Sequence, residues 1–189
     1  NEIGVQNSID PSLLQYEGRN YLVWGSFRGI YVIELTADGL SIMSGAKKKR
    51  IAGTAFEAVY IHKHGDYYYM FASIGSCCQG VKSTYKVVVG RSKKVWGPYK
   101  DKTGKPMLKN GYSLVIGAND HFVGNGHGSQ IIQDDAGQDW LLYHGFSRST
   151  PENGRILLLD QIKWDQEGWP YVEGGSPSYE TQKAPVFNN

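Results

Sequence analysis

The chain has 189 residues, of which 20 are basic and 18 acidic, and its net charge is +2 with the histidines neutral. Because both signs are mixed along the chain, there is no basic stripe of the kind that nucleic acids require, and we expect no nucleic-acid partner. The apolar runs are as short as strands, far below the roughly 18 residues of a membrane-spanning helix, so no membrane span is expected.

The pattern of apolar residues predicts an all-β chain. Short runs rich in Val, Ile, Tyr and Phe alternate with polar residues and end at many of the 24 glycines, a pattern typical of strands rather than helices. Residues 7–50 open with Asp10, continue through an apolar strand, turn at Glu17 and Gly18, and give an aromatic strand and then a third strand. The basic run at 47–50 favours a solvated loop over a polyanion site.

Residues 54–100 and 124–172 repeat this order of elements. The second repeat opens with Glu57 and turns at Gly65-Asp66, and the third opens with His127 and turns at Ala136-Gly137. Repeats of this length, each with several strands, are typical of β-propellers, in which the innermost strand of every blade lines a central channel.

The pattern therefore predicts where the polar residue that opens each repeat lies in the fold. Asp10, Glu57 and His127 should converge near the axis of the channel, although they lie far apart in the sequence. Taken alone, Asp10 would be a turn former, Glu57 a solvated strand charge, and His127 a loop or core histidine. Their equivalent positions in three repeats favour a shared site.

Three blades cannot close a ring, and an open arc would leave exposed sheet edges. We therefore expect residues 1–189 to be a single partial propeller domain that supplies about three blades, with 173–189 as a tail or a ring-closing segment. Because residue 1 is Asn rather than Met, we expect the missing blades on an upstream segment, in the same chain or as a separate cleaved chain.

The aromatic residues favour one class of partner, and the two cysteines limit the disulfide bonds that the chain can form. The 13 Tyr and five Trp residues favour a carbohydrate partner, because flat amphipathic rings stack on sugars; Trp24 and Trp96 are equally suited to stacking and to core packing. Cys77 and Cys78 are adjacent, which excludes a long-range disulfide framework within the chain, and we expect them to be small buried residues rather than a vicinal disulfide.

Several motifs together resemble one family of enzymes. NSIDPSLL, YLVWGSF, FEAVYIHKHGDYYYMF and GHGSQ are similar to motifs of the five-bladed propellers of glycoside hydrolase family 43, in its α-1,5-L-arabinanase branch. The resemblance runs over essentially the whole chain but covers only the later blades, so the first blade, which carries the catalytic base aspartate of the family, is missing.

The resemblance implies a fold, an activity and a set of site residues. It implies a five-bladed propeller that cleaves α-1,5-linked L-arabinan with inversion, with Glu57 in the place of the general acid and Asp10 in the place of the aspartate that modulates and orients the acid. His127 matches the channel histidine that helps to hold a central metal, calcium or a similar hard cation. The substrate would be plant cell-wall arabinan or its oligosaccharides, and a polymeric substrate implies a secreted, periplasmic or cell-surface protein.

Inverting hydrolysis with a general acid and a modulating aspartate requires one protonated and one ionised carboxyl group. Glu57 must keep its proton near neutral pH, and both a neighbouring ionised Asp10 and burial among Phe56 and Tyr60 would favour this. Candidate sugar-binding residues are less specific: Ser76 and Cys77 in a Gly-flanked loop, and Arg91 and His144 at strand ends, where an Arg is more often paired with a carboxylate.

Other functions remain open at this point. An α-L-arabinofuranosidase or a β-xylosidase of the same family would use the same carboxylates. A non-catalytic propeller that only binds polysaccharide is the alternative from a different class.

Overall fold

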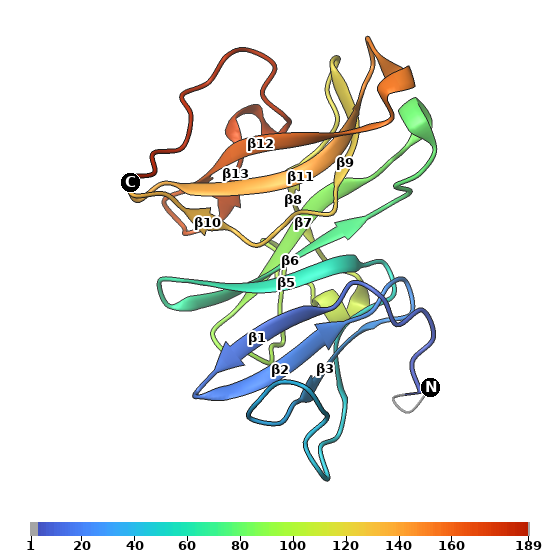
Figure 1. Cartoon of the computed structure of the whole chain (residues 1–189), viewed down its shortest axis with the longest axis vertical. Coiled ribbons are helices and arrows are strands. Elements are labelled where there is room, and N and C mark those ends of the chain that lie inside the picture. The colour runs from blue at the N-terminus through green and yellow to red at the C-terminus, as the bar shows by residue number, and fades with distance from the viewer. Residues whose placement is uncertain (1–3, 189) are drawn as a thin grey trace. The chain divides into compact units, whose positions relative to one another are not determined.

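The computed structural model describes residues 4–188, and these residues form an all-β structure. Thirteen strands and four 3-10 turns are assigned in them: η1 (Gly80–Lys82), η2 (Met107–Lys109), η3 (Pro151–Asn153) and η4 (Glu173–Gly175). The strands form three sheets, each made from consecutive strands of the chain (Figure 1). None of the helices in the described residues is long and apolar enough to cross a membrane.

The first sheet has the order β1 (Ser12–Tyr16), β2 (Arg19–Trp24), β3 (Ile30–Glu34) and β4 (Lys49–Ala52). The predicted turn between β1 and β2 is confirmed: Glu17 and Gly18 have φ values of 48° and 73°, and positive φ at both positions is what a tight hairpin turn requires. One face of this sheet packs around Trp24 with Val5 and Ile33.

The second sheet has the order β5 (Glu57–His64), β6 (Tyr67–Ile74), β7 (Lys86–Ser92) and β8 (Ser113–Ile116). The predicted turn at Gly65-Asp66 lies between β5 and β6. The first four residues of β5 and the last six of β6 are buried, and the rings of Tyr60 and Phe71 stack with centroids 5.2 Å apart. Glu57 is therefore the first residue of a strand that is anchored by aromatic packing.

The third sheet contains β9 (Phe122–Gly126), β10 (Ile132–Gln133), β11 (Asp139–Ser147), β12 (Arg155–Trp164) and β13 (Pro170–Tyr171). β9 and β10 both pair with β11, one at its end and the other at its start. The leading strand of the third repeat is therefore interrupted between residues 126 and 132. His127, with a φ of 51°, lies in this interruption and does not open a strand.

The chain divides into two compact units. Unit 1 comprises residues 1–72 and 90–113, and unit 2 comprises residues 73–89 and 114–189. The first sheet belongs to unit 1 and the third to unit 2, while the division falls within β6, β7 and β8. The single partial domain that the sequence predicts stays a prediction.

The segment after η4 lies along the third sheet within unit 2. The backbone N–H of Ser178 donates to Asp160 Oδ1 at 3.0 Å, and that of Val186 donates to Asp134 Oδ2 at 3.1 Å. This brings the end of the described chain back beside β10 (Figure 1). A ring-closing role for residues 173–189 stays a prediction.

Candidate active site

Unit 1 brings the two predicted carboxylates together. Asp10 lies two residues before β1, and Glu57 is the first residue of β5. Asp10 Oδ2 accepts a hydrogen bond of 3.0 Å from the backbone N–H of Ala58, the residue that follows Glu57. Two acids that are 47 positions apart in the sequence therefore lie at the same point of the structure.

Glu57 is a buried carboxyl group and not a solvated surface charge. Only 7% of the residue is exposed, and its Oε2 accepts a hydrogen bond of 2.7 Å from the hydroxyl of Ser26, which is 1% exposed. A buried carboxyl group requires such a partner, because desolvation without a hydrogen bond costs several kcal/mol. Ser26 lies within one of the family-like motifs, but nothing in the sequence distinguishes it from other serines that follow a strand.

The backbone around the two acids is held in an unfavourable conformation. Asp10, Phe27 and Ala58 have φ values of 54°, 48° and 50°, in a region that costs non-glycine residues of order 1–3 kcal/mol. The N–H of Phe27 donates to the carbonyl of Phe56 at 2.9 Å, and the N–H of Ala58 donates to Asp10. Hydrogen bonds made by the strained residues themselves thus fix the segments on either side of Glu57.

Two further hydrogen bonds join the segments that carry the acids. The hydroxyl of Ser12 donates to the carbonyl of Val59 at 2.8 Å, and the N–H of Gly25 donates to the carbonyl of Ile9 at 3.0 Å. β1, the end of β2 and the start of β5 are thereby joined, which fixes the backbone that carries the two acids.

His127 lies in unit 2, within a row of three rings. Its backbone N–H donates to Ser73 Oγ at 2.8 Å. Its imidazole stacks on that of His144 with centroids 6.3 Å apart, and His144 stacks on Tyr85 at 5.7 Å. His144 belongs to β11 and pairs with Gly126 of β9, where a Cβ atom would lie 2.2 Å from the Tyr85 ring. Only glycine at 126 allows this ring row.

The residues around His127 in unit 2 do not make up a calcium shell. Calcium takes six to eight oxygen ligands, whereas His127 offers one imidazole nitrogen, its ring neighbour is a second imidazole, and the hydroxyl of Ser73 already accepts its backbone N–H. Water or substrate would have to supply most of the ligands. We therefore assign no chemical step to a metal here.

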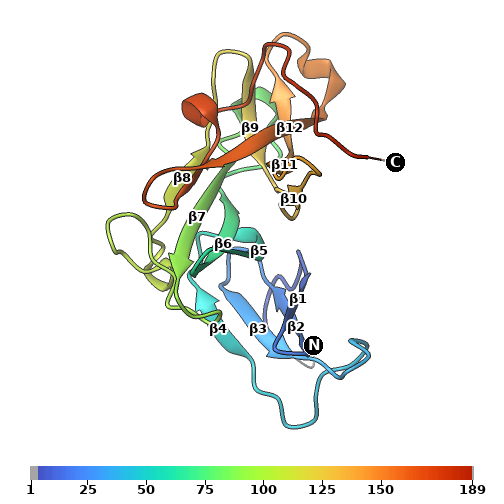
Figure 2. The same cartoon turned by 90° about the vertical axis from the view of Figure 1, so that its left-hand side faces the viewer.

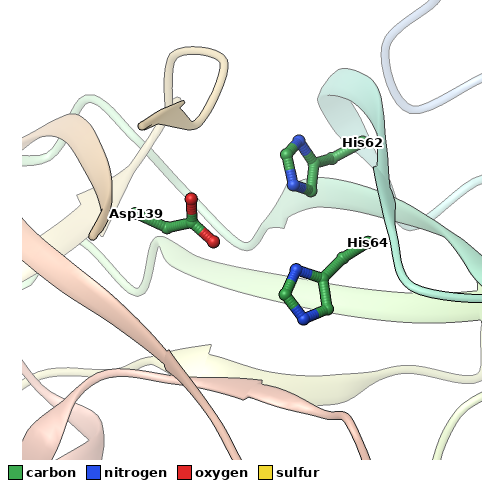
Figure 3. Close-up of side chains that lie close together, drawn as sticks. All are labelled: His62, His64 and Asp139. Carbon is green, nitrogen blue, oxygen red and sulfur yellow. The ribbon is translucent and has the colours of Figure 1, made fainter. Parts of the chain in front are cut away.

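Two other histidines share a face of a strand. His62 and His64 are two residues apart on β5, and their side chains project to the same side of it (Figure 3). Their nearest ligand atoms lie within 4.8 Å of each other. Asp139, also labelled in Figure 3, begins β11 in unit 2, where its Oδ2 accepts from Trp164 Nε1 at 2.7 Å. None of these residues was predicted as a metal ligand from the sequence.

Burial and charge keep His144 neutral. Burial, the nearby Arg155 guanidinium and His127 together lower the pKa of His144 to about 4, and both of its ring nitrogens are buried without a hydrogen-bond partner in the described part of the chain. The residue therefore serves unit 2 as a neutral aromatic ring. Its predicted role at the rim of a sugar site stays a prediction.

The folded state should lose stability in acid because of His144. The pKa is depressed on folding, so the unfolded state takes up this proton near pH 6.5 and the folded state only near pH 4. The stabilisation is complete above pH 6.5 and is lost as pH falls toward 4, by about 2 to 3 kcal/mol. Urea denaturation at pH 7 and 4.5 should show a smaller loss for His144→Phe than for the unmodified chain. Equal losses in the two proteins would contradict this account.

The other candidate sugar-binding residues lie in different parts of the structure. The guanidinium of Arg91 lies over the ring of Tyr67 at 4.4 Å. Tyr67 follows the turn after β5, so it is about 23 Å along the strand from Glu57. Ser76 begins a loop of unit 2, and its carbonyl accepts the N–H of Tyr85 at 3.1 Å. A role in sugar binding stays a prediction for each of them.

The expectation for the cysteines was wrong. Cys77 and Cys78 form a vicinal disulfide, and Cys78 is exposed. The physical reason is the loop that carries them, which is closed at the surface by the hydrogen bonds of Ser76 with Thr84, so neither thiol could enter the core. Trp24 is a core residue, 2% exposed, while Trp96 is half-buried beside Tyr21.

The chain is built from successive sheets. Asp10 precedes the leading strand of the first sheet and accepts a hydrogen bond from the residue after Glu57, which begins the leading strand of the second sheet. This is the construction of the propeller glycoside hydrolases. Comparison with known proteins identifies the family. Residues 1–170 match Glycosyl hydrolases family 43, and the chain belongs to this family.

Several relatives and solved structures that resemble the chain are named as arabinan-degrading proteins. It is 40% identical over 183 residues to "Extracellular exo-alpha-(1->5)-L-arabinofuranosidase ArbA" of Cellvibrio japonicus, covering 88% of this chain and 52% of the relative. It is 36% identical over 171 residues to "Extracellular endo-alpha-(1->5)-L-arabinanase 1" of Bacillus subtilis, covering 87% and 50%. The solved α-L-arabinanase of Cellvibrio cellulosa, complexed with arabinohexaose, superimposes with a TM-score of 0.81 at 36% identity, covering 88% and 57%.

These comparisons confirm the predicted fold class, a five-bladed propeller of which this chain supplies about three blades. The structural relatives are five-bladed propellers, and this chain provides three sheets of that fold. The chain spans about half the length of the curated relatives it matches.

Proposed function

We propose that the chain supplies the general acid and its modulating aspartate to an inverting glycosidase that cleaves α-1,5-linked L-arabinan. The observation that carries the proposal is the hydrogen bond from Ala58 N–H to Asp10, which holds a second carboxylate beside the buried Glu57. The family, and the arabinan substrates in the names of the relatives, support the choice of substrate.

The geometry supports distinct roles for the two carboxyl groups. Glu57, buried and bonded to Ser26, would hold the proton that passes to the leaving oxygen of the glycosidic bond. Asp10, half-exposed and bonded to the backbone N–H of the residue after Glu57, would be the aspartate that modulates and orients the acid.

The catalytic base completes this mechanism. Inversion needs a carboxylate roughly 6.5–9.5 Å from the acid, with room for the attacking water. We place this aspartate on an upstream propeller segment outside these 189 residues, in the same chain or in a separate one. We further propose an extracellular site of action, which the names of two relatives support.

Product analysis tests the proposed function. The protein that carries this chain together with its upstream segment should release arabinose or short arabino-oligosaccharides from debranched arabinan, with linear xylan as the control substrate. Activity on xylan or on aryl xylosides alone would overturn the choice of substrate. No hydrolysis of any glycoside, with arabinan binding retained, would favour the polysaccharide-binding alternative.

An exo-acting arabinofuranosidase is the second candidate, because the Cellvibrio relative carries that name. An endo-acting enzyme would release a range of oligosaccharides at early times and lower the viscosity of the polymer. An exo-acting enzyme would release a single small product while the viscosity stays high.

A further inference from the structure

Unit 1 contains a groove that is separate from the carboxylates. It has a volume of about 190 Å³ and lies over β2 and β3, and none of the candidate catalytic residues lines it. Its main lining residues are Tyr21, Val32, Glu34, Lys47, Lys49 and Trp96. β3 lies beside both β2 and β4, as the strand order of the sheet requires (Figure 2).

The strand register explains why these side chains share one face. Tyr21 pairs with Glu34 across β2 and β3, and Val32 pairs with Lys49 across β3 and β4. Because side chains alternate along a strand, all four point to the same side of the sheet. Trp96 packs on this side, with its ring centroid 4.6 Å from that of Tyr21.

The groove has an excess of positive charge. Glu34 pairs with Arg19, whose Nη1 lies 3.2 Å from its Oε1, so this acid is balanced by a basic partner. The exposed Lys47 and Lys49 add two further positive charges. The other two members of the basic run serve the fold instead: Lys48 Nζ donates to the carbonyl of Gly4, and Arg50 Nε donates to that of Ala52.

We propose that this groove is a second carbohydrate-binding site, which takes one acidic sugar residue of a uronate-containing polysaccharide. The half-buried Trp96 offers a flat face on which the carbons of a pyranose ring can stack. The two lysines would bind the uronate carboxylate, and the Glu34 carboxylate would accept hydrogen bonds from sugar hydroxyls.

The size and charge of the groove favour this occupant over others. At about 190 Å³ it is smaller than the roughly 300–1,000 Å³ of a site that encloses a whole small molecule, so it suits one residue of a chain that continues outside it. A neutral arabinan would leave the two lysines of the groove without an anionic partner.

Binding of a tetra-galacturonate to the chain tests the proposal by calorimetry at low and moderate salt. The Lys47→Gln/Lys49→Gln double variant should bind about tenfold more weakly and lose most of the salt dependence, since each ionic contact at an exposed site is worth up to about 1 kcal/mol. The matched control, Lys82→Gln/Lys109→Gln, removes the same charge elsewhere and should bind like the unmodified chain.

Variants of Trp96 distinguish binding that includes sugar stacking from binding by charge alone. Trp96→Ala should weaken tetra-galacturonate binding by about fivefold to tenfold, and Trp96→Phe, which keeps a ring beside Tyr21, should restore part of it. Poly-glutamate and a single-stranded oligonucleotide serve as competing polyanions. No binding of tetra-galacturonate by the unmodified chain, equal binding by both lysine double variants, or stronger binding of either competitor would overturn the proposal.

The outcome does not depend on the proposed hydrolase activity. Both lysine variants leave Asp10, Glu57 and Ser26 intact, so they should hydrolyse short neutral arabino-oligosaccharides at the rate of the unmodified protein. Loss of hydrolysis in the Glu57→Gln variant, with tetra-galacturonate binding unchanged, would show that the two sites are separate.

Discussion

Glu57→Gln should lower the rate of arabinan hydrolysis by about a thousandfold while leaving arabino-oligosaccharide binding within about threefold, because loss of a general acid typically costs 10²–10⁴. Glutamine keeps an acceptor for the Ser26 hydroxyl but has no proton for the leaving oxygen. Steady-state kinetics on debranched arabinan and calorimetry with arabinotriose measure the two effects in the protein that includes the upstream segment.

The nature of the leaving group provides the control for this prediction. An aryl arabinofuranoside with an acidic phenol needs little protonation, so Glu57→Gln should slow its hydrolysis far less than that of arabinan. Glu17→Gln, in the exposed turn between β1 and β2, should change neither rate. Equal losses on both substrates would mean that Glu57 is not the acid, and full activity would remove it from the mechanism.

Asp10→Asn should lower the rate of arabinan hydrolysis by about a hundredfold without lowering the thermal midpoint. Asparagine can still accept the hydrogen bond from Ala58 N–H, so the fold and the strained backbone should persist. Loss of the neighbouring negative charge should therefore act on the reaction and not on the fold. The value of kcat/KM on debranched arabinan and the thermal midpoint should be measured together.

A purely structural role for Asp10 predicts a different result. In that case the thermal midpoint would fall, and kcat/KM measured well below that midpoint would stay close to the value of the unmodified protein. Asp38→Asn, at an exposed acid of unit 1, serves as the matched loss of charge and should leave kcat/KM unchanged.

The parts of the fold that depend on local chemistry could be predicted from the sequence. The positive φ of Glu17 and Gly18 follows from a short polar turn between two apolar runs, and the all-β class follows from the short alternating runs themselves. The meeting of Asp10 and Glu57 could be predicted because both precede or open the leading strand of a repeat.

The rest depends on contacts between distant residues. Ser26 becomes a partner of Glu57 only when the end of β2 is placed beside the start of β5. The ring row of Tyr85, His144 and His127 depends on the bare backbone of Gly126. The disulfide could not be predicted, because the adjacency of two cysteines in the sequence does not indicate whether their loop lies at the surface or in the core.

The placement of His127 also shows the limit of an argument from repeats. The repeat pattern predicts that His127 opens a strand, whereas it interrupts one. The order of strands in the repeats does not fix where each leading strand starts, because a break in a strand has no signature in the apolar pattern.

A crystal structure of the Glu57→Gln protein with bound arabinotriose, including the upstream segment, tests the shared site most directly. The account predicts a glycosidic oxygen within hydrogen-bond distance of the side chain at position 57, with Asp10 still accepting from Ala58 N–H. Sugar bound only at a surface remote from both side chains, while hydrolysis of the unmodified protein is intact, would contradict it.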